Sequence, residues 1–226
     1  DGTRTFHAHN DNRGWGQCFV YDINTDVPED QTFYYLKGTL ENVAAPSFTW
    51  TSPQLVGAIL DSPSPSSLDY WGRSVACNST GDIMAISAPQ EESGGTQRGL
   101  VRVYQFNGTE WAQNGLDFYG DANNDRMGHS LDINSTGDIV AISAPYNDGT
   151  TDGTDVGQIK IYKYVGAYWS QIGDTLYGNA DNAYFGYTFD MNSTGEYIVV
   201  GAYGANTIYV YYYNAELWSL IGEITG

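Results

Sequence analysis

The chain has 226 residues, with 27 acidic against 9 basic side chains and a formal net charge of −18. So few cations exclude nucleic-acid binding, and the absence of any apolar run of about 18 residues excludes a membrane-spanning helix. The 19 tyrosines and 27 glycines favour strands joined by tight turns over long helices. The sequence therefore predicts an all-β fold, and the acidic charge suits solubility in a salty extracellular medium.

The first segment, residues 1–54, matches the rest of the chain only at isolated points. Trp15-Gly16 precedes Trp71-Gly72 by 56 residues, and Trp50 lies near the place where later units carry a tryptophan. Residues 22–49 have no counterpart. Residues 1–54 are thus either a degenerate blade or a separate β segment, which could donate a strand to a neighbouring subunit.

Two cysteines, Cys18 and Cys77, are too few for a disulfide scaffold. In a secreted protein they would form one disulfide bond. The alternative is that both are small buried apolar side chains.

Residues 55–226 contain three tandem units, at about 68–122, 123–179 and 180–226. Each unit opens with a glycine that follows a large apolar residue, and the three pairs are Trp71-Gly72, Met127-Gly128 and Phe185-Gly186. Each unit also carries an Asn-Ser-Thr-Gly turn and a later tryptophan, which is Trp111, Trp169 or Trp218. Self-similarity at a fixed period is typical of repeat architectures.

The second unit predicts four strands. Residues 129–133 and 138–144 form the first two, with a near-continuous apolar run in the second that indicates a strand covered on both faces. Residues 158–164 form the third strand and the fourth surrounds Trp169. Four-stranded units that need neighbours to bury their faces are typical of a β-propeller, so we expect three clear blades and one degenerate amino-terminal blade.

These motifs resemble the FG-GAP repeats of integrin-α-like propellers and of surface proteins of bacteria and algae. The resemblance rests on Phe185-Gly186 with Gly201-Ala202-Tyr203, and covers about residues 68–226. It implies a propeller blade and an extracellular, adhesive or structural role, without chemistry. It also implies a calcium loop in the first hairpin, but here that hairpin reads Asp132-Ile-Asn134-Ser-Thr-Gly137-Asp138 and lacks the middle carboxylate, so we expect no calcium there.

Four acceptor sequons for N-glycosylation are present, at Asn78, Asn107, Asn134 and Asn192. Hairpin tips would expose such asparagines. The alternative is that Asn-Ser-Thr-Gly is turn chemistry alone, with Asn closing the turn and Gly supplying a positive φ.

Two loops contain several oxygen ligands that could bind Ca²⁺, the one cofactor that the sequence suggests. The first contains Asp121, Asn123 and Asp125, followed by Arg126 where a calcium loop has its turn glycine. The second contains Asp148, Asp152 and Asp155. The alternative for both loops is a chance cluster in an acidic surface.

The strand Tyr209-Val-Tyr211-Tyr212-Tyr213 could stack alternate tyrosines on sugars or on a neighbouring subunit. Ordinary cross-strand aromatic pairing is the alternative.

No nucleophile motif or phosphate-binding glycine loop is present, so we expect no enzyme. The predicted function is a secreted or cell-surface repeat protein with an adhesive or structural role and a protein or glycan partner. One alternative is a subunit of a self-assembling extracellular filament, in which neighbours complete the blades. The other is a carbohydrate-binding propeller.

Overall fold

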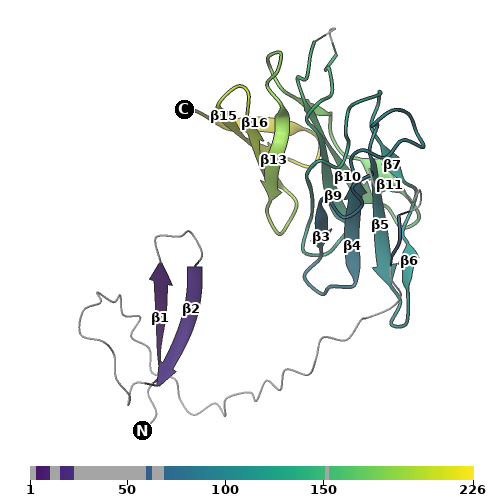
Figure 1. The fold of residues 1–226 in the computed structure, drawn as a ribbon. Coiled ribbons are helices and arrows are strands. Elements are labelled where there is room, and N and C mark those ends of the chain that lie inside the picture. Colours follow the sequence, from purple (N-terminus) through teal and green to yellow (C-terminus); the bar gives the residue numbers. More distant parts are fainter. Residues whose placement is uncertain (1–3, 11–15, 23–59, 63–68, 151–152) are drawn as a thin grey trace. The chain divides into compact units, whose positions relative to one another are not determined.

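A computed structural model describes residues 4–10, 16–22, 60–62, 69–150 and 153–226 (Figure 1). The chain divides into two compact units, Asp1–Gln54 and Leu55–Gly226. In the first unit β1 (Arg4–Asn10) pairs antiparallel with β2 (Gly16–Asp22), and only the backbone of these strands is described. Trp15 and Trp50 lie outside the described residues. That residues 1–54 form a degenerate blade therefore stays a prediction.

The second unit consists of three antiparallel sheets that follow one another along the chain (Figure 1). Blade 1 comprises β3 (Val75–Cys77), β4 (Ile83–Ala88), β5 (Leu100–Phe106), β6 (Trp111–Gln113) and β7 (Phe118–Tyr119). Blade 2 comprises β8 (Leu131–Ile133), β9 (Ile139–Ala144), β10 (Gln158–Tyr164), β11 (Trp169–Gln171) and β12 (Leu176–Tyr177). Blade 3 comprises β13 (Phe185–Met191), β14 (Tyr197–Ala202), β15 (Thr207–Tyr213) and β16 (Trp218–Thr225).

The all-β, propeller-like fold is therefore confirmed. Each blade is a meander in which consecutive strands pair, and the short strands β7 and β12 add a second pairing to β5 and β10. β9 is buried along its whole length, as the continuous apolar run predicts. Within the described ranges no helix is long and apolar enough to cross a membrane.

Two apolar layers hold the three blades together. The layer between blades 1 and 2 consists of Ala85, Val101, Val103, Phe118, Met127, Leu131, Val140, Ile142 and Ala144. The layer between blades 2 and 3 consists of Ile139, Ala141, Ile159, Ile161, Leu176, Phe185, Phe189, Met191, Ile198, Val200, Ala202, Tyr209 and Trp218. Alternate residues of β9 thus enter different layers, because successive side chains of a strand point to opposite faces.

The glycines that open the second and third units mark close approaches between blades. Gly128 has a φ of +87°, and a Cβ there would lie 2.6 Å from Val101 of blade 1. Gly186 has a φ of +82°, and its Cβ would lie 2.9 Å from Ile159 of blade 2. Gly72 has a φ of +84° but nothing within 4 Å of such a Cβ. The repeated glycine thus fits a left-handed backbone that presses on the preceding blade.

The repeated tryptophans also connect neighbouring blades. The indole N–H of Trp169 donates to the carbonyl of Asn114 in blade 1 (2.9 Å), and that of Trp218 donates to Ile172 in blade 2 (3.1 Å). Each ring fills an inter-blade layer while its one polar group is satisfied. In blade 1, Trp111 packs against Phe106 with ring centroids 5.2 Å apart.

Of the two interpretations of the β15 tyrosines, cross-strand aromatic pairing is present, because Tyr212 lies opposite Tyr197 with ring centroids 4.8 Å apart. Tyr209 is buried and packs on Phe185, and Tyr211 also contacts that ring. These tyrosines face blade 2 because the apolar layer there takes every second residue of the strand.

Candidate functional site

The first hairpin of each blade is closed by its asparagine. In blade 1 the side-chain oxygen of Asn78 accepts hydrogen bonds from the backbone N–H groups of Asp82 and Ile83, each at 3.1 Å. The Asn78 amide donates to the side chains of Thr80 and Asp82. Asn134 accepts from the N–H of Ile139 and donates to Thr136 and Asp138. Asn192 accepts from the N–H groups of Glu196 and Tyr197 and donates to Thr194. The turn chemistry predicted for Asn-Ser-Thr-Gly is therefore present in all three blades.

The hairpin tips also pack on one another. The N–H of Ser79 donates to the carbonyl of Ser135 (3.0 Å), and the N–H of Ser135 donates to that of Ser193 (2.9 Å). As a result Asn78 and Asn134 are only 6% and 3% exposed.

The four sequons are consequently not equivalent. Asn192 on the last hairpin and Asn107 on the β5–β6 hairpin are exposed. A glycan on Asn78 or Asn134 would have to displace the amide hydrogen bonds and the neighbouring tip. Asn107 and Asn192 are the two sites that the fold leaves accessible.

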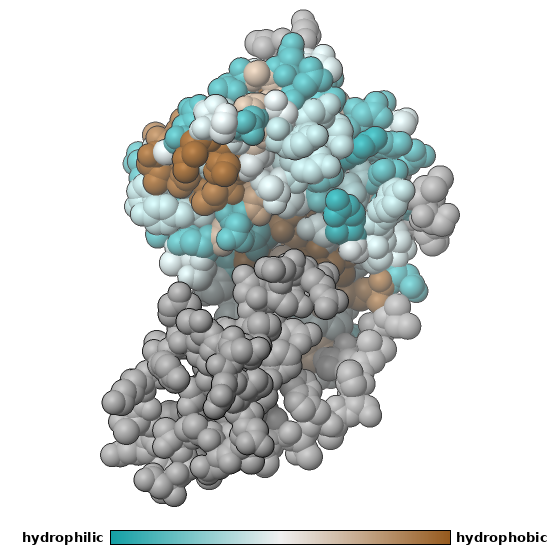
Figure 2. Space-filling view, turned by 60° about the vertical axis from the view of Figure 1, so that its left-hand side comes forward, coloured by the Kyte–Doolittle hydropathy of each residue, from teal (hydrophilic) through white to brown (hydrophobic). Residues whose placement is uncertain are grey.

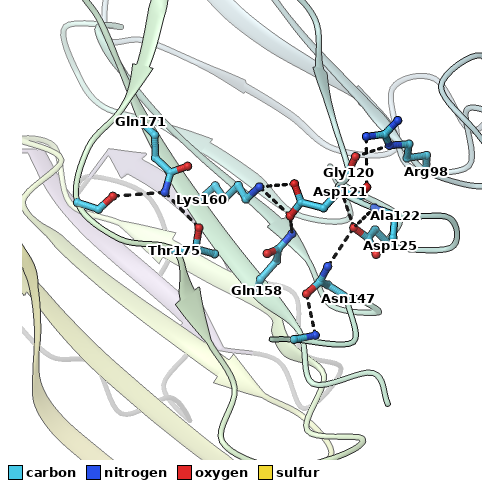
Figure 3. Close-up of polar contacts among 12 residues, drawn as sticks. Arg98, Gly120, Asp121, Ala122, Asp125, Asn147, Gln158, Lys160, Gln171 and Thr175 are labelled. Carbon is cyan, nitrogen blue, oxygen red and sulfur yellow. Dashed lines mark hydrogen bonds and ion pairs between the residues drawn. The ribbon is translucent and has the colours of Figure 1, made fainter. Parts of the chain in front are cut away.

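The loop predicted to bind calcium at Asp121, Asn123 and Asp125 is a polar junction between blades 1 and 2 (Figure 3). One oxygen of Asp125 accepts from the N–H groups of Asp121 (2.8 Å) and Ala122 (2.9 Å), and from the amide of Asn147 (3.0 Å). Asn123 instead lies against Gly95. Burial raises the pKa of Asp125, while the hydrogen bonds it accepts act against that rise.

Asp121 turns toward β10 rather than toward Asp125 (Figure 3). Its carboxylate accepts from the Lys160 ammonium at 2.6 and 2.7 Å, and from the Gln158 amide at 2.9 Å. Burial alone would raise the pKa of Asp121, but the bonds from Lys160 and Gln158 outweigh it and hold the pKa below its ordinary value. Protein donors thus occupy oxygens that a cation would need.

The second predicted loop contains Asp148 and Asp155, while Asp152 lies outside the described residues. Asp148 accepts from the backbone N–H of Asp155 at 3.1 Å, so the loop is closed on itself. Across the described ranges no three His, Cys, Asp or Glu side chains converge on one point. Calcium binding at either loop stays a prediction.

Cys77 is a free and exposed thiol on β3. The alternative that Cys77 is a buried apolar residue is wrong. The Cys18–Cys77 bond stays a prediction. The side chain of Cys18 lies outside the described residues.

A row of aromatic and cationic side chains, here called the aromatic strip, runs across the three blades and was missed by the sequence reasoning. His129 packs on Tyr146 and Tyr187, Tyr184 packs on Tyr146 and Tyr203, and Tyr187 packs on Tyr203. The ring centroids of these five pairs are 4.6 to 6.1 Å apart. The strip consists of Tyr70, Arg73, Arg126, His129, Tyr146, Tyr184, Tyr187 and Tyr203.

The strip is both exposed and charged. Tyr203 is 72% exposed and Tyr70 is 51% exposed. The Arg126 guanidinium lies 4.4 Å from the centre of the Tyr146 ring, and it lines a hollow together with Tyr70 and His129. Burial, and then the charge of Arg73, lower the pKa of His129.

An alignment of the units would have shown the strip. The residue two positions before each repeat glycine is Tyr70, Arg126 or Tyr184, and the residue directly after it is Arg73, His129 or Tyr187. These positions vary while their neighbours repeat, and all are large, which is the signal of a shared surface rather than a shared core.

Comparison with known proteins shows only distant likenesses. No family model matches the chain, and no curated protein matches it. A 6-phosphogluconolactonase-like protein from Bacteroides fragilis is 14% identical, with a TM-score of 0.48 over 67% of this chain and 38% of that one. A similar protein from Bacteroides uniformis is 13% identical, with a TM-score of 0.49 over 67% and 39%. Sqt1 from Saccharomyces cerevisiae is 8% identical, with a TM-score of 0.48 over 71% and 37%.

Proposed function

We propose that this protein is a non-catalytic, extracellular repeat module that adheres to glycans through the aromatic strip. The observation that carries the proposal is the exposed run of tyrosines beside Arg126 and His129. Exposed aromatic faces with a polar rim mark recognition surfaces, because a folded chain gains nothing by leaving them in water. Sugars present both the C–H faces that stack on rings and the hydroxyls that bind such polar groups.

A structural use of the acidic residues supports the non-catalytic part of the proposal. Asp121 and Asp125 each accept several hydrogen bonds from protein donors. The residues that repeat along the chain lie in turns and in inter-blade layers. The resemblance to FG-GAP repeats agrees with an extracellular setting.

The binding test uses the purified full chain on an array of immobilised neutral and acidic glycans. We expect the double variant Tyr70→Ala/Tyr203→Ala to lose at least about tenfold in affinity, since each ring supplies contact area at an end of the strip. Tyr168→Ala is the matched control, because that tyrosine is 60% exposed on the separate β10–β11 hairpin. Equal binding by the double variant and wild type would overturn the proposal.

The extracellular setting is tested by glycopeptide mass spectrometry of the protein from its native source. We expect glycans on Asn107 and Asn192 and none on Asn78 and Asn134. Treatment with an N-glycosidase that leaves the mass of the native chain unchanged would contradict the glycoprotein assignment.

A second candidate function is a subunit of a self-assembling extracellular filament. The observation that favours it is the uncovered apolar face of blade 3, where Val199 and Ile208 are each 44% exposed. A repeat array with an open end must cover that end or leave an associating surface.

A further inference from the structure

Blade 3 has an apolar face turned away from blade 2, here called the trailing face. Val199 and Ile208 of this face are each 44% exposed, whereas Ala141 and Ile159, their equivalents in blade 2, are fully buried under blade 3. In Figure 2, which brings the blade 3 side of the molecule forward, apolar side chains form a brown patch on the described surface. The exposed apolar side chains of the trailing face are Tyr197, Val199, Ile208 and Ile224.

The trailing face also carries unused polar groups in a defined register. In blade 2 the Asp132 carboxylate accepts from the N–H of Met191 in blade 3 at 2.9 Å, and Ser135 donates to Ser193. The equivalent of Asp132 in blade 3 is Asp190, which is exposed. Within the described ranges the Ser193 N–H has no acceptor. Blade 3 thus offers one acceptor and one donor where a following blade would bind.

Blade 1 offers the complementary groups at the opposite end of the array. Val75 is 64% exposed and Cys77 is exposed, on the strand that in blades 2 and 3 packs onto the preceding blade. Gly72 has nothing within 4 Å of a Cβ. The carbonyl of Ser79 has no donor among the described residues. Among the described residues of the second unit, no preceding blade packs on β3 as one packs on β8 and on β13.

We infer that the trailing face binds β3 of a second copy of this chain, head to tail. The contact repeats the register of the two interfaces inside the chain. Asp190 accepts from the N–H of Cys77 in the second copy, and the Ser193 N–H donates to the carbonyl of Ser79 there. Such a heterologous contact leaves the same two surfaces free at the ends, so it propagates into a filament or closes into a ring.

The occupant is a second copy because both halves of the contact exist in this one sequence. The two internal interfaces show that a first strand of this repeat fits a trailing face of this repeat, and the backbone bond between serines of the hairpin tips recurs in both. The bond from a first-strand N–H to a carboxylate is present between blades 2 and 3, where Asp132 supplies the acceptor that Asp190 supplies in blade 3. The inference rests on the second candidate function, since it names the partner of that assembly. The net charge of −18 opposes the contact at low ionic strength, so the tests use about 0.5 M salt, where the Debye length is short.

The first test is a disulfide trap in the otherwise native full chain. Asp190→Cys places a thiol opposite the native Cys77 of the second copy, and mild oxidation should produce a ladder of covalent oligomers on a non-reducing gel. Asn107→Cys is the matched control, because it adds one exposed thiol on a hairpin outside the contact. Peptide mapping must find the bond between residues 77 and 190 of different molecules.

Each other result overturns the inference. A bond from residue 190 to Cys18 shows that the amino-terminal unit covers the trailing face. Oligomers that contain no bond between 77 and 190 overturn the head-to-tail contact while self-assembly stands. A chain that stays monomeric at high concentration overturns both.

The second test needs no cysteine. Val199→Glu buries a charge in the proposed contact but leaves a folded monomer, because the side chain is exposed there. Sedimentation should show at least a tenfold weaker association than wild type, while Tyr168→Glu associates like wild type. Unchanged association of Val199→Glu, with circular dichroism showing a native fold, would contradict the contact.

Discussion

Blades 2 and 3 are built from the same repeat, yet among the described sheets only blade 2 has another sheet packed on each face. β9 is buried at every position, whereas β14 alternates between buried and exposed residues. Both strands keep apolar residues on both faces, since Ala141 corresponds to Val199 in sequence. The repeat therefore encodes stacking at every blade, and whether a face is buried depends on the position of the blade in the array.

The test with the largest expected effect replaces equivalent isoleucines of blades 2 and 3 by alanine. Ile159→Ala should lower the free energy of unfolding by about 3 kcal/mol, because it opens a cavity in a closed layer. Ile208→Ala should cost less than about 1 kcal/mol, because solvent already reaches that side chain. Urea unfolding at low protein concentration measures both values. Equal losses would show that the blade 3 face is also covered in the folded monomer.

A second test uses the repeated glycine at a covered and an open position. Gly186→Ala should cost about 2 kcal/mol or more, since it adds a Cβ 2.9 Å from Ile159 to the strain of a positive φ. Gly72→Ala should cost about 1 kcal/mol, from backbone strain alone. The difference in melting temperature between the variants isolates the steric part. A larger loss for Gly72→Ala would show that blade 1 has a neighbour at this point.

The repeat made most of the fold predictable. The Asn-Ser-Thr-Gly turns and the apolar run before Pro145 place β8 and β9 within two residues of the observed bounds, because turn chemistry and strand burial are local properties. Which face of β15 is buried, and therefore which tyrosines are buried, was not predictable. Alternation shows that Tyr209 and Tyr211 share a face, but only the neighbouring blade decides which face is buried.

The candidate sites were less predictable than the fold, for a related reason. Asp121 and Asp125 share one loop, and sequence spacing alone favours a shared cation. In the structure they point to different donors, and Lys160 and Asn147 come from blade 2. Partners contributed by another sheet leave no mark on local spacing.

Comparison of equivalent positions in the three blades identifies one buried side chain with an unpaired hydrogen-bonding atom. In blade 2 the Asn147 amide donates to Asp125, and in blade 3 the equivalent of Asn147 is Ala205. In blade 1 the equivalent is Glu91, which is fully buried. One of its oxygens accepts from the N–H of Ser93 at 2.8 Å, and the other has no partner among the described residues.

Replacing Glu91 by an amide should therefore stabilise the protein. Glu91→Gln keeps an acceptor for Ser93 and replaces the unpaired oxygen by an amide donor, the group with which the equivalent Asn147 donates to Asp125 in blade 2. We expect the free energy of unfolding at pH 7 to rise by about 1 kcal/mol, the usual cost of one buried unpaired group. Glu92→Gln, at the exposed neighbouring residue, should change it little. A loss of stability in Glu91→Gln would refute the assignment.

The smallest expected effect concerns the ion pair that joins the Asp121 loop to β10. The folded state holds the pKa of Asp121 below its ordinary value, so at low pH the unfolded chain binds this proton more readily than the folded chain. The pair therefore contributes stability above about pH 4, the ordinary pKa of Asp, and that contribution is lost as the pH falls through the lower, folded pKa. The contribution is below about 1 kcal/mol, because the Asp121 side chain is 47% exposed and water screens the pair. Asp121→Asn should flatten this part of the stability–pH curve. If the Asp121→Asn curve keeps the wild-type slope below pH 4, the ion pair does not join the blades in solution.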